Sequence, residues 1–180
     1  DVYKRQVSLF AALIAVLGLA PKVMLASGVP ITAQSMGIML CGTVLGAQRG
    51  ALAVLLFITL TALGLPLLSG GRGGLGVFAS PSVGFIVGFP LAAFVAGWIT
   101  SKLRLINVFY SSLLGALVGG ILILYIPGIV GMSIMLDKSI SEAALIALIY
   151  LPGDCIKAFL CAILTYTLFK LRPENVLSRI

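Results

Sequence analysis

An acid and a base stand three residues apart in the last apolar stretch of the chain. Asp154 and Lys157 belong to LPGDCIKAFLCAILTYTLF, in which no other side chain is charged. Ionisable groups within a bilayer are costly and usually face a cavity or a partner, so by default they indicate a functional site. A spacing of three residues puts both side chains on one helical face, where they can contact one small molecule. The alternative is a structural ion pair that holds helices together.

The composition places this pair in a membrane protein. Of the 180 residues, 61% are hydrophobic and 9% are charged, and the mean hydropathy is +1.21. Soluble domains carry about 25% charged residues. We therefore predict an integral membrane protein with one transmembrane domain over residues 1–180. The net charge of +7 does not indicate a nucleic-acid partner, because the bases fall between apolar runs and form no dense cluster.

The residue types that are missing argue against an enzyme. The chain has no histidine, which removes the commonest general base and metal ligand. It has no GxxxxGK[ST] motif, so it cannot use ATP through a P-loop of its own. Its three cysteines have no paired spacing and lie in apolar runs, which is typical of small hydrophobic residues. We predict no enzymatic activity, no cofactor and no metal, and any energy must come from an ion gradient or a partner protein.

Glycine, proline and charge divide the chain into apolar runs. The final run, residues 143–171, would extend about 43 Å as one straight helix, against a hydrocarbon core of about 30 Å. We expect it to divide at Pro152, with a helix from there to Leu171 and a shorter helix or re-entrant piece over Ala143–Tyr150. The predicted fold is an all-α bundle of six transmembrane helices. The five earlier helices are expected at Val7–Ala20, Ile31–Gln48, Ala51–Leu68, Val83–Thr100 and Val108–Ile126.

The positive-inside rule predicts the orientation of this bundle. The first six residues, DVYKRQ, are expected not to be native sequence, and the first helix is expected to be truncated because Val7–Ala20 falls short of the roughly 20 residues of a span. Without those residues, six bases still lie on one side against three on the other. We therefore expect both termini in the cytoplasm, with Asp154 and Lys157 in the outer part of the last helix. The inner bases are Arg49, Lys102, Arg104, Lys170, Arg172 and Arg179, and the outer ones are Lys22, Arg72 and Lys138.

Polar groups elsewhere add candidates to the site. The irregular segment Ser69–Pro81 carries five glycines, and its formal GxGxxG match is rejected because no βαβ unit surrounds it. The segment is interpreted either as a mobile flap, in which Arg72 can bind a carboxylate, or as a flexible connector. Gln34, near the outer start of the second helix, can hydrogen-bond a ligand or merely cap or bridge helices. Ala11 and Ala15, spaced by four, can serve internal packing or docking to another membrane protein.

Three stretches taken in order resemble the BioY family, the biotin-binding S components of energy-coupling-factor (ECF) vitamin importers. They are VPITAQSMGIMLCGTVLGAQRGALAVLLF, LGLPLLSGGRGGLGVFASPSVGFIVGFPLAAFVAGW and PGDCIKA. The resemblance implies a six-helix substrate-binding domain in the prokaryotic plasma membrane that takes biotin from outside. It also implies association with a membrane-embedded coupling protein and two ABC-type ATPase subunits. One departure is PSVGF at residues 81–85, where Phe85 replaces the tyrosine of a PTxGY-like form.

The resemblance also implies roles for the candidate residues. Asp154 would accept a hydrogen bond from an N–H of the ureido ring of biotin while Lys157 donates to its carbonyl. Arg72 or the glycine-rich loop would meet the carboxylate. Apolar parts of the ligand would be covered by Phe78, Phe85 and Tyr150. The face of Ala11 and Ala15 resembles the small-residue surface with which S components meet the coupling protein.

Other functions remain open at this point. An S component for another vitamin, such as riboflavin or thiamine, should show more Trp and Tyr than this chain has in its candidate site. A stand-alone proton-coupled carrier would use Asp154 and Lys157 as a relay. A purely structural membrane scaffold would bind no saturable ligand.

Overall fold

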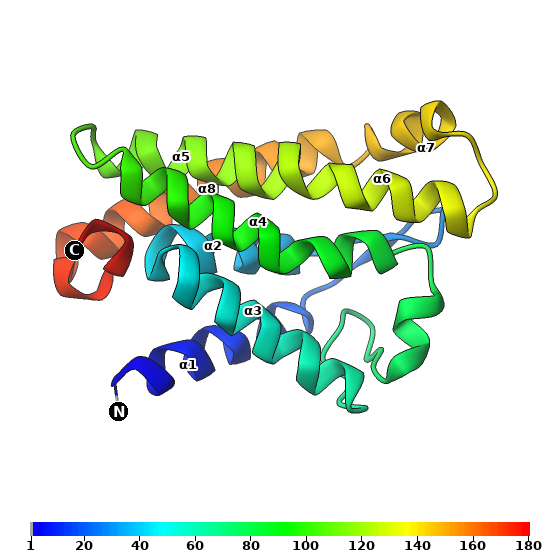
Figure 1. Ribbon diagram of the computed structural model, residues 1–180, viewed down its shortest axis with the longest axis horizontal. Helices are drawn as coiled ribbons and strands as arrows, with labels where there is room; N and C mark the ends of the chain where they lie inside the picture. Colours follow the sequence, from blue (N-terminus) through cyan, green and yellow to red (C-terminus); the bar gives the residue numbers. More distant parts are fainter. Residues whose placement is uncertain (1) are drawn as a thin grey trace.

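Helices account for most of the computed structural model, which describes residues 2–180 (Figure 1). Eight α-helices follow one another within this range, and α5 and α6 are joined without a break by a π-helical turn at Val118–Ile123. Short 3-10 turns at Leu75–Ala79, Pro173–Asn175 and Leu177–Arg179 complete the helical content. The α-helices are α1 Val2–Leu17, α2 Gln34–Leu45, α3 Ala47–Ala62, α4 Val83–Lys102, α5 Val108–Leu117, α6 Leu124–Met135, α7 Ile140–Ala147 and α8 Leu151–Leu171.

Helix length and apolar composition indicate a membrane protein. In the described chain, α4 and the continuous helix Val108–Met135 are long and apolar enough to cross a bilayer. A third span results if α7 and α8, which bend by 53° at their junction, count as one. Helices α2 and α3 are apolar but shorter. Large apolar side chains also face outward along these helices, as Leu91, Leu122 and Ile156 do.

Helix α4 occupies the centre of the arrangement. It contacts α2, α3, α5 and α6, and α8 packs against α5 and α2. Both termini lie at one end of the molecule, and α7 and the segment after α3 lie at the other (Figure 1). Helices α2, α4 and α8 all run toward the end that holds the termini, so their first turns lie on the side of the other end, near one another (Figure 1).

The second and third helices differ from the predicted ranges. Within the expected helix Ile31–Gln48 the structure forms the shorter helix α2. Gly46, which has φ +85°, ends α2, and α3 begins at the next residue. This left-handed backbone favours glycine, which has no Cβ to clash. Helix α3 ends at Ala62, earlier than the predicted Leu68, and Gly64 follows with φ +111°. A glycine in this conformation just beyond the last turn is a common helix stop.

The fifth predicted helix continues beyond its expected end at Ile126. Pro127 lies inside α6, and the helix runs on to Met135. Proline lacks the N–H that would bond to the carbonyl four residues earlier, here that of Ile123. Ile123 is the last residue of the π-helical turn. The missing bond therefore falls where the α-helical pattern is already interrupted, and the proline does not end the helix.

The division of the last apolar run near Pro152 is confirmed. Helix α7 ends at Ala147, and α8 begins at Leu151 with Pro152 in its first turn. Ser139 and Glu142 form a capping box at the start of α7, the side chain of each accepting from the backbone N–H of the other. Asp154 thus lies in the first turn of α8, as the local sequence predicted.

A small antiparallel hairpin joins α1 to α2 and was not predicted. Strand β1, Val23–Met24, pairs with β2, Pro30–Ile31. Its turn contains Gly28 with φ +79°. The Ser-Gly pair between apolar residues is the local signal for this turn. The hairpin matters because β2 and the residue before it, Val29, line the cavity described below.

Candidate functional site

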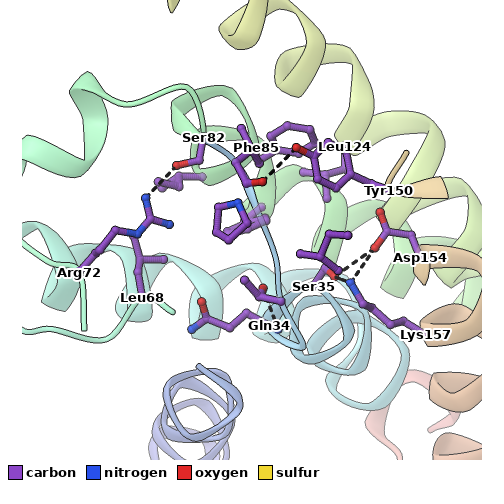
Figure 2. Close-up of a pocket in the computed structure, with 16 residues that line it drawn as sticks. Gln34, Ser35, Leu68, Arg72, Ser82, Phe85, Leu124, Tyr150, Asp154 and Lys157 are labelled. Carbon is purple, nitrogen blue, oxygen red and sulfur yellow. Dashed lines mark hydrogen bonds and ion pairs between the residues drawn. The ribbon is translucent and has the colours of Figure 1, made fainter. Parts of the chain in front are cut away.

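A cavity of about 590 Å³, including its open mouth, lies among the first turns of α2, α4 and α8. The hairpin, the segment before α4 and Leu124 of α6 complete its wall (Figure 2). Its lining residues are Val29, Pro30, Ile31, Thr32, Gln34, Ser35, Leu68, Arg72, Ser82, Phe85, Ile86, Phe89, Leu124, Tyr150, Asp154 and Lys157.

The acid and the base predicted from the sequence form an ion pair in this wall. Lys157 Nζ lies 2.9 Å from Asp154 Oδ1. Ser35 of α2 joins them: Lys157 donates to its Oγ over 2.9 Å, and that hydroxyl donates to Asp154 Oδ1 over 3.3 Å. Both charged side chains are largely buried, with 9% of Asp154 and 16% of Lys157 exposed. Each charge is therefore compensated within the protein, while both groups face the cavity (Figure 2).

The second carboxylate oxygen of Asp154 is held from behind the cavity wall. Tyr125 of α6 donates its hydroxyl to Asp154 Oδ2 over 2.7 Å. Tyr125 is buried and is not among the residues that line the cavity. The carboxylate is thus fixed on one side by a tyrosine and on the other by a lysine and a serine. Its orientation is therefore set by three hydrogen bonds from two other helices and from α8 itself.

Arg72 lies across the cavity from this ion pair (Figure 2). Its guanidinium donates to Ser69 O over 3.3 Å and to Ser82 Oγ over 3.4 Å. Both acceptors are neutral, and among residues 2–180 no acidic side chain forms an ion pair with it. Partial burial lowers the pKa of Arg72 from its ordinary value. An anionic group in the cavity would supply the charge compensation that these contacts lack, and a carboxylate fits the planar fork best.

Two of the three predicted aromatic residues reach the cavity. Phe85 packs edge-on against Tyr150 and Tyr125, with ring centroids 6.1 Å apart in both pairs. The hydroxyl of Tyr150 donates to Val29 O over 3.0 Å and is 2.9 Å from Ser27 Oγ, so the hairpin fixes this ring. Phe78 does not line the cavity but packs against the hydrophobic core. Its contact with a ligand stays a prediction.

Gln34 is engaged by the protein itself. Its Nε2 donates to Ile14 O over 3.0 Å and to Leu67 O over 2.9 Å, and its Oε1 accepts from Ser69 N over 3.0 Å. The side chain is 3% exposed although the residue borders the cavity. These bonds tie α1, α2 and the segment after α3 together. The bridging role is thus present, and ligand contact stays a prediction.

Gln34→Leu should lower the free energy of unfolding by about 2–3 kcal/mol, because it keeps the volume but leaves the backbone groups Leu67 O and Ser69 N without partners. Ile14 O loses one donor and keeps its bond from Gly18 N. Chemical or thermal unfolding in detergent measures this effect. The exposed Gln48 provides the matched control, and Gln48→Leu should change stability little. Equal stability of Gln34→Leu and the parent would refute the bridging role.

Sequence and structure comparisons agree on a family. The sequence model of the BioY family matches residues 5–174. The chain belongs to the BioY family. It is 46% identical over 182 aligned residues to the biotin transporter BioY of Rhodobacter capsulatus, with 96% of both chains covered. It is 47% identical over 165 residues to the biotin transporter BioY of Rhizobium etli, with 87% of both chains covered.

A solved structure extends this relationship to the fold. The crystal structure of the S-component for biotin from an ECF-type ABC transporter matches with a TM-score of 0.88 and 30% identity. The match covers 93% of this chain and 90% of that chain. The helical membrane fold of this BioY-family member is therefore the fold of an S component.

The small residues of α1 differ from the expectation for a BioY docking face. Ala11 is only 4% exposed and packs in the protein's own core, and Ala15 is partly buried against the same core. The outward side of α1 carries Leu9, Ala12 and Val16. Docking of a partner at Ala11 and Ala15 stays a prediction, and this outward side is the part of α1 that the protein's own core leaves open.

Sequence reasoning missed two polar residues of this BioY site, Ser35 and Tyr125. Both bond to Asp154, from 119 and 29 residues away in sequence. Ser35 follows Gln34, so its place near the start of α2 was available as a signal. Tyr125 lies within the helix predicted at Val108–Ile126, but nothing in the local sequence indicates that its hydroxyl reaches Asp154 of α8.

Proposed function

We propose that this BioY-family chain binds biotin and is the S component of an ECF-type ABC importer. The observation that carries the proposal is an ion pair and an arginine on opposite sides of one cavity. Biotin presents a ureido ring at one end and a carboxylate at the other, separated by an apolar chain. Relatives that match this chain over nearly their whole length are named biotin transporters.

The two ends of biotin match the two sides of the cavity. Asp154 accepts from a ureido N–H, and Lys157 donates to the adjacent carbonyl oxygen. Hydrogen bonds of this charge-assisted kind contribute about 1.5–3 kcal/mol each. Arg72 receives the carboxylate, and Phe85 and Tyr150 cover apolar parts of the ligand between the two ends.

The chain crosses the cell membrane six times with both termini in the cytoplasm. The six passes are α1, α2, α3, α4, the continuous α5–α6 helix, and α8 with α7 at its outer end. The location of both termini at one end of the molecule supports this topology (Figure 1). The first turns of α2, α4 and α8 then lie on the outer side, and the cavity takes biotin from outside.

Transport requires partners that supply energy. A membrane-embedded coupling protein and two ABC-type ATPase subunits drive delivery of biotin to the cytoplasm. The segment between α3 and α4, which holds Arg72, closes over the ligand once its carboxylate is bound. No covalent step is catalysed by this chain.

Calorimetric titration of the purified protein with biotin tests the binding function. Saturable binding with one site per chain is expected, and an absence of binding would refute the proposal. The energy source is tested separately by uptake in cells. Uptake that depends on the ATPase subunits supports the S component, whereas uptake that survives their loss and collapses with an uncoupler would establish a proton-coupled carrier.

Substitutions on two sides of α1 should separate partner docking from folding. Ala12→Leu adds bulk on the outward side and should reduce co-purification with the coupling protein while biotin affinity is unchanged. Ala11→Leu adds the same bulk toward the core and should destabilise the protein by about 1–3 kcal/mol. Normal assembly of the Ala12→Leu variant would exclude this side of α1 from the docking surface.

A further inference from the structure

The hydroxyl of Ser35 bridges the two charged groups that face the cavity. It accepts a hydrogen bond from Lys157 Nζ over 2.9 Å and donates one to Asp154 Oδ1 over 3.3 Å. Ser35 itself lines the cavity, beside both partners (Figure 2). The Ser35 hydroxyl on α2 thus hydrogen-bonds to the acid and to the base of α8 at the same time.

This pattern of donor and acceptor is that of a cyclic urea. A urea places a carbonyl acceptor next to an N–H donor, and the serine hydroxyl likewise accepts from the lysine and donates to the aspartate. Nζ and Oδ1 are 2.9 Å apart, so a ligand group that pairs with both must offer its acceptor and its donor side by side. The Ser35 hydroxyl already acts as this acceptor for Lys157 and as this donor to Asp154.

The hydrogen-bonding capacity of Asp154 favours replacement of Ser35 over addition of a ligand beside it. Oδ1 has two lone pairs and accepts from both Lys157 and Ser35. Oδ2 accepts from Tyr125, which lies outside the cavity lining. A ligand N–H that pairs with Oδ1, the oxygen beside Lys157, therefore takes the place of the serine hydroxyl, while one lone pair of Oδ2 stays open.

The bond from Ser35 to Asp154 is also the longest of this cluster. Hydroxyl–oxygen hydrogen bonds are usually 2.5–3.0 Å long. The bond from Tyr125 to Asp154 is 2.7 Å, whereas that from Ser35 is 3.3 Å. Displacement of Ser35 would break this long bond together with the 2.9 Å bond from Lys157, and a ureido group would replace both.

We propose that Ser35 is an internal competitor, whose hydroxyl holds the place of the ureido group and yields it when the ligand binds. The inference rests on the proposed function and concerns the same cavity. Binding then exchanges one donor–acceptor pair for another, so the ion pair is never left without its bridging partner. The exchange lowers the net gain from the ureido contacts and so sets the affinity.

Ser35→Ala tests the inference by calorimetry and thermal unfolding of the purified protein. Biotin should bind about three- to tenfold more tightly, because binding no longer breaks the serine bonds. The ligand-free variant should melt below the ligand-free parent, while the two biotin-saturated proteins should melt at the same temperature. Dethiobiotin, which keeps the ureido ring, should gain affinity by the same factor.

Ser112→Ala is the matched control. The Ser112 hydroxyl is buried in α5, lies outside the cavity lining and has no hydrogen-bond partner among the described residues. Its loss should leave the affinity for both ligands unchanged.

Other results of the Ser35 experiment would overturn the inference. Weaker binding by Ser35→Ala, with a saturated complex that melts below the saturated parent, would show that the hydroxyl holds the ligand. Unchanged affinity would show that it does not compete. Unequal gains for biotin and dethiobiotin would place the effect away from the ureido ring. A parent protein that binds no biotin would instead refute the proposed function, which Ser35→Ala does not affect.

Discussion

Asp154→Asn should weaken biotin binding by roughly 10- to 150-fold, the equivalent of one charge-assisted hydrogen bond. The amide keeps the size of the side chain but removes the negative charge that we propose accepts from the ureido N–H. It also leaves Lys157 without its 2.9 Å counter-charge. Lys157→Ala should have an effect of similar size, because it removes the donor to the carbonyl oxygen and leaves the carboxylate uncompensated. Calorimetric titration measures both variants.

The exposed acid Glu174 serves as the control for this pair. It lies 3.8 Å from Arg172 near the end of the molecule that holds both termini, and both side chains are more than half exposed. Glu174→Gln should therefore leave biotin affinity unchanged. Thermal unfolding in detergent establishes that each variant is folded before it is titrated. Undiminished affinity in both Asp154→Asn and Lys157→Ala would remove the ion pair from the site.

Local chemistry explains what the sequence predicted well. The start of α8 depends on Pro152 and on an acid in the first turn, which are properties of neighbouring residues. The helical face shared by Asp154 and Lys157 follows from their spacing alone, and their 2.9 Å contact agrees with it. The predicted location of Arg72 in an irregular segment rich in glycine also holds, and the structure adds that it faces the cavity.

Tertiary contacts explain what could not be predicted. Apolar periodicity does not distinguish a proline that ends a helix from one that a π-helical turn accommodates, so the extension of α6 to Met135 was missed. Tyr125 lies inside the predicted helix, but its contact with Asp154 depends on how α6 packs against α8. The amide of Gln34 is equally able to bind a ligand and to bridge helices. Only the positions of Ile14, Leu67 and Ser69 show that it hydrogen-bonds within the protein. The inward direction of Ala11 likewise depends on which side of α1 the other helices cover.

Gly84→Ala should have the largest effect on stability. Gly84 lies in the first turn of α4 where this helix crosses α6, and a Cβ there would collide with the backbone carbonyl of Pro127 and approach Gly131 Cα at 3.0 Å. These are backbone atoms that cannot move aside by a rotamer change. Overpacking of this kind costs about 3 kcal/mol, and the two helices must separate to relieve it. Unfolding in detergent should show the loss directly.

Gly153→Ala separates this steric effect from the general effect of replacing a helical glycine. Gly153 also lies in the first turn of a helix, α8, but a Cβ there has no atom within 4 Å among the described residues. Alanine is the better helix former by about 1 kcal/mol, so Gly153→Ala should stabilise the ligand-free protein slightly. Opposite signs for the two variants are expected. If both variants were equally stable, α4 and α6 would not be in the close contact seen here. That contact joins the helix of Phe85 to the helix of Tyr125, so its loosening should also reduce biotin affinity in Gly84→Ala.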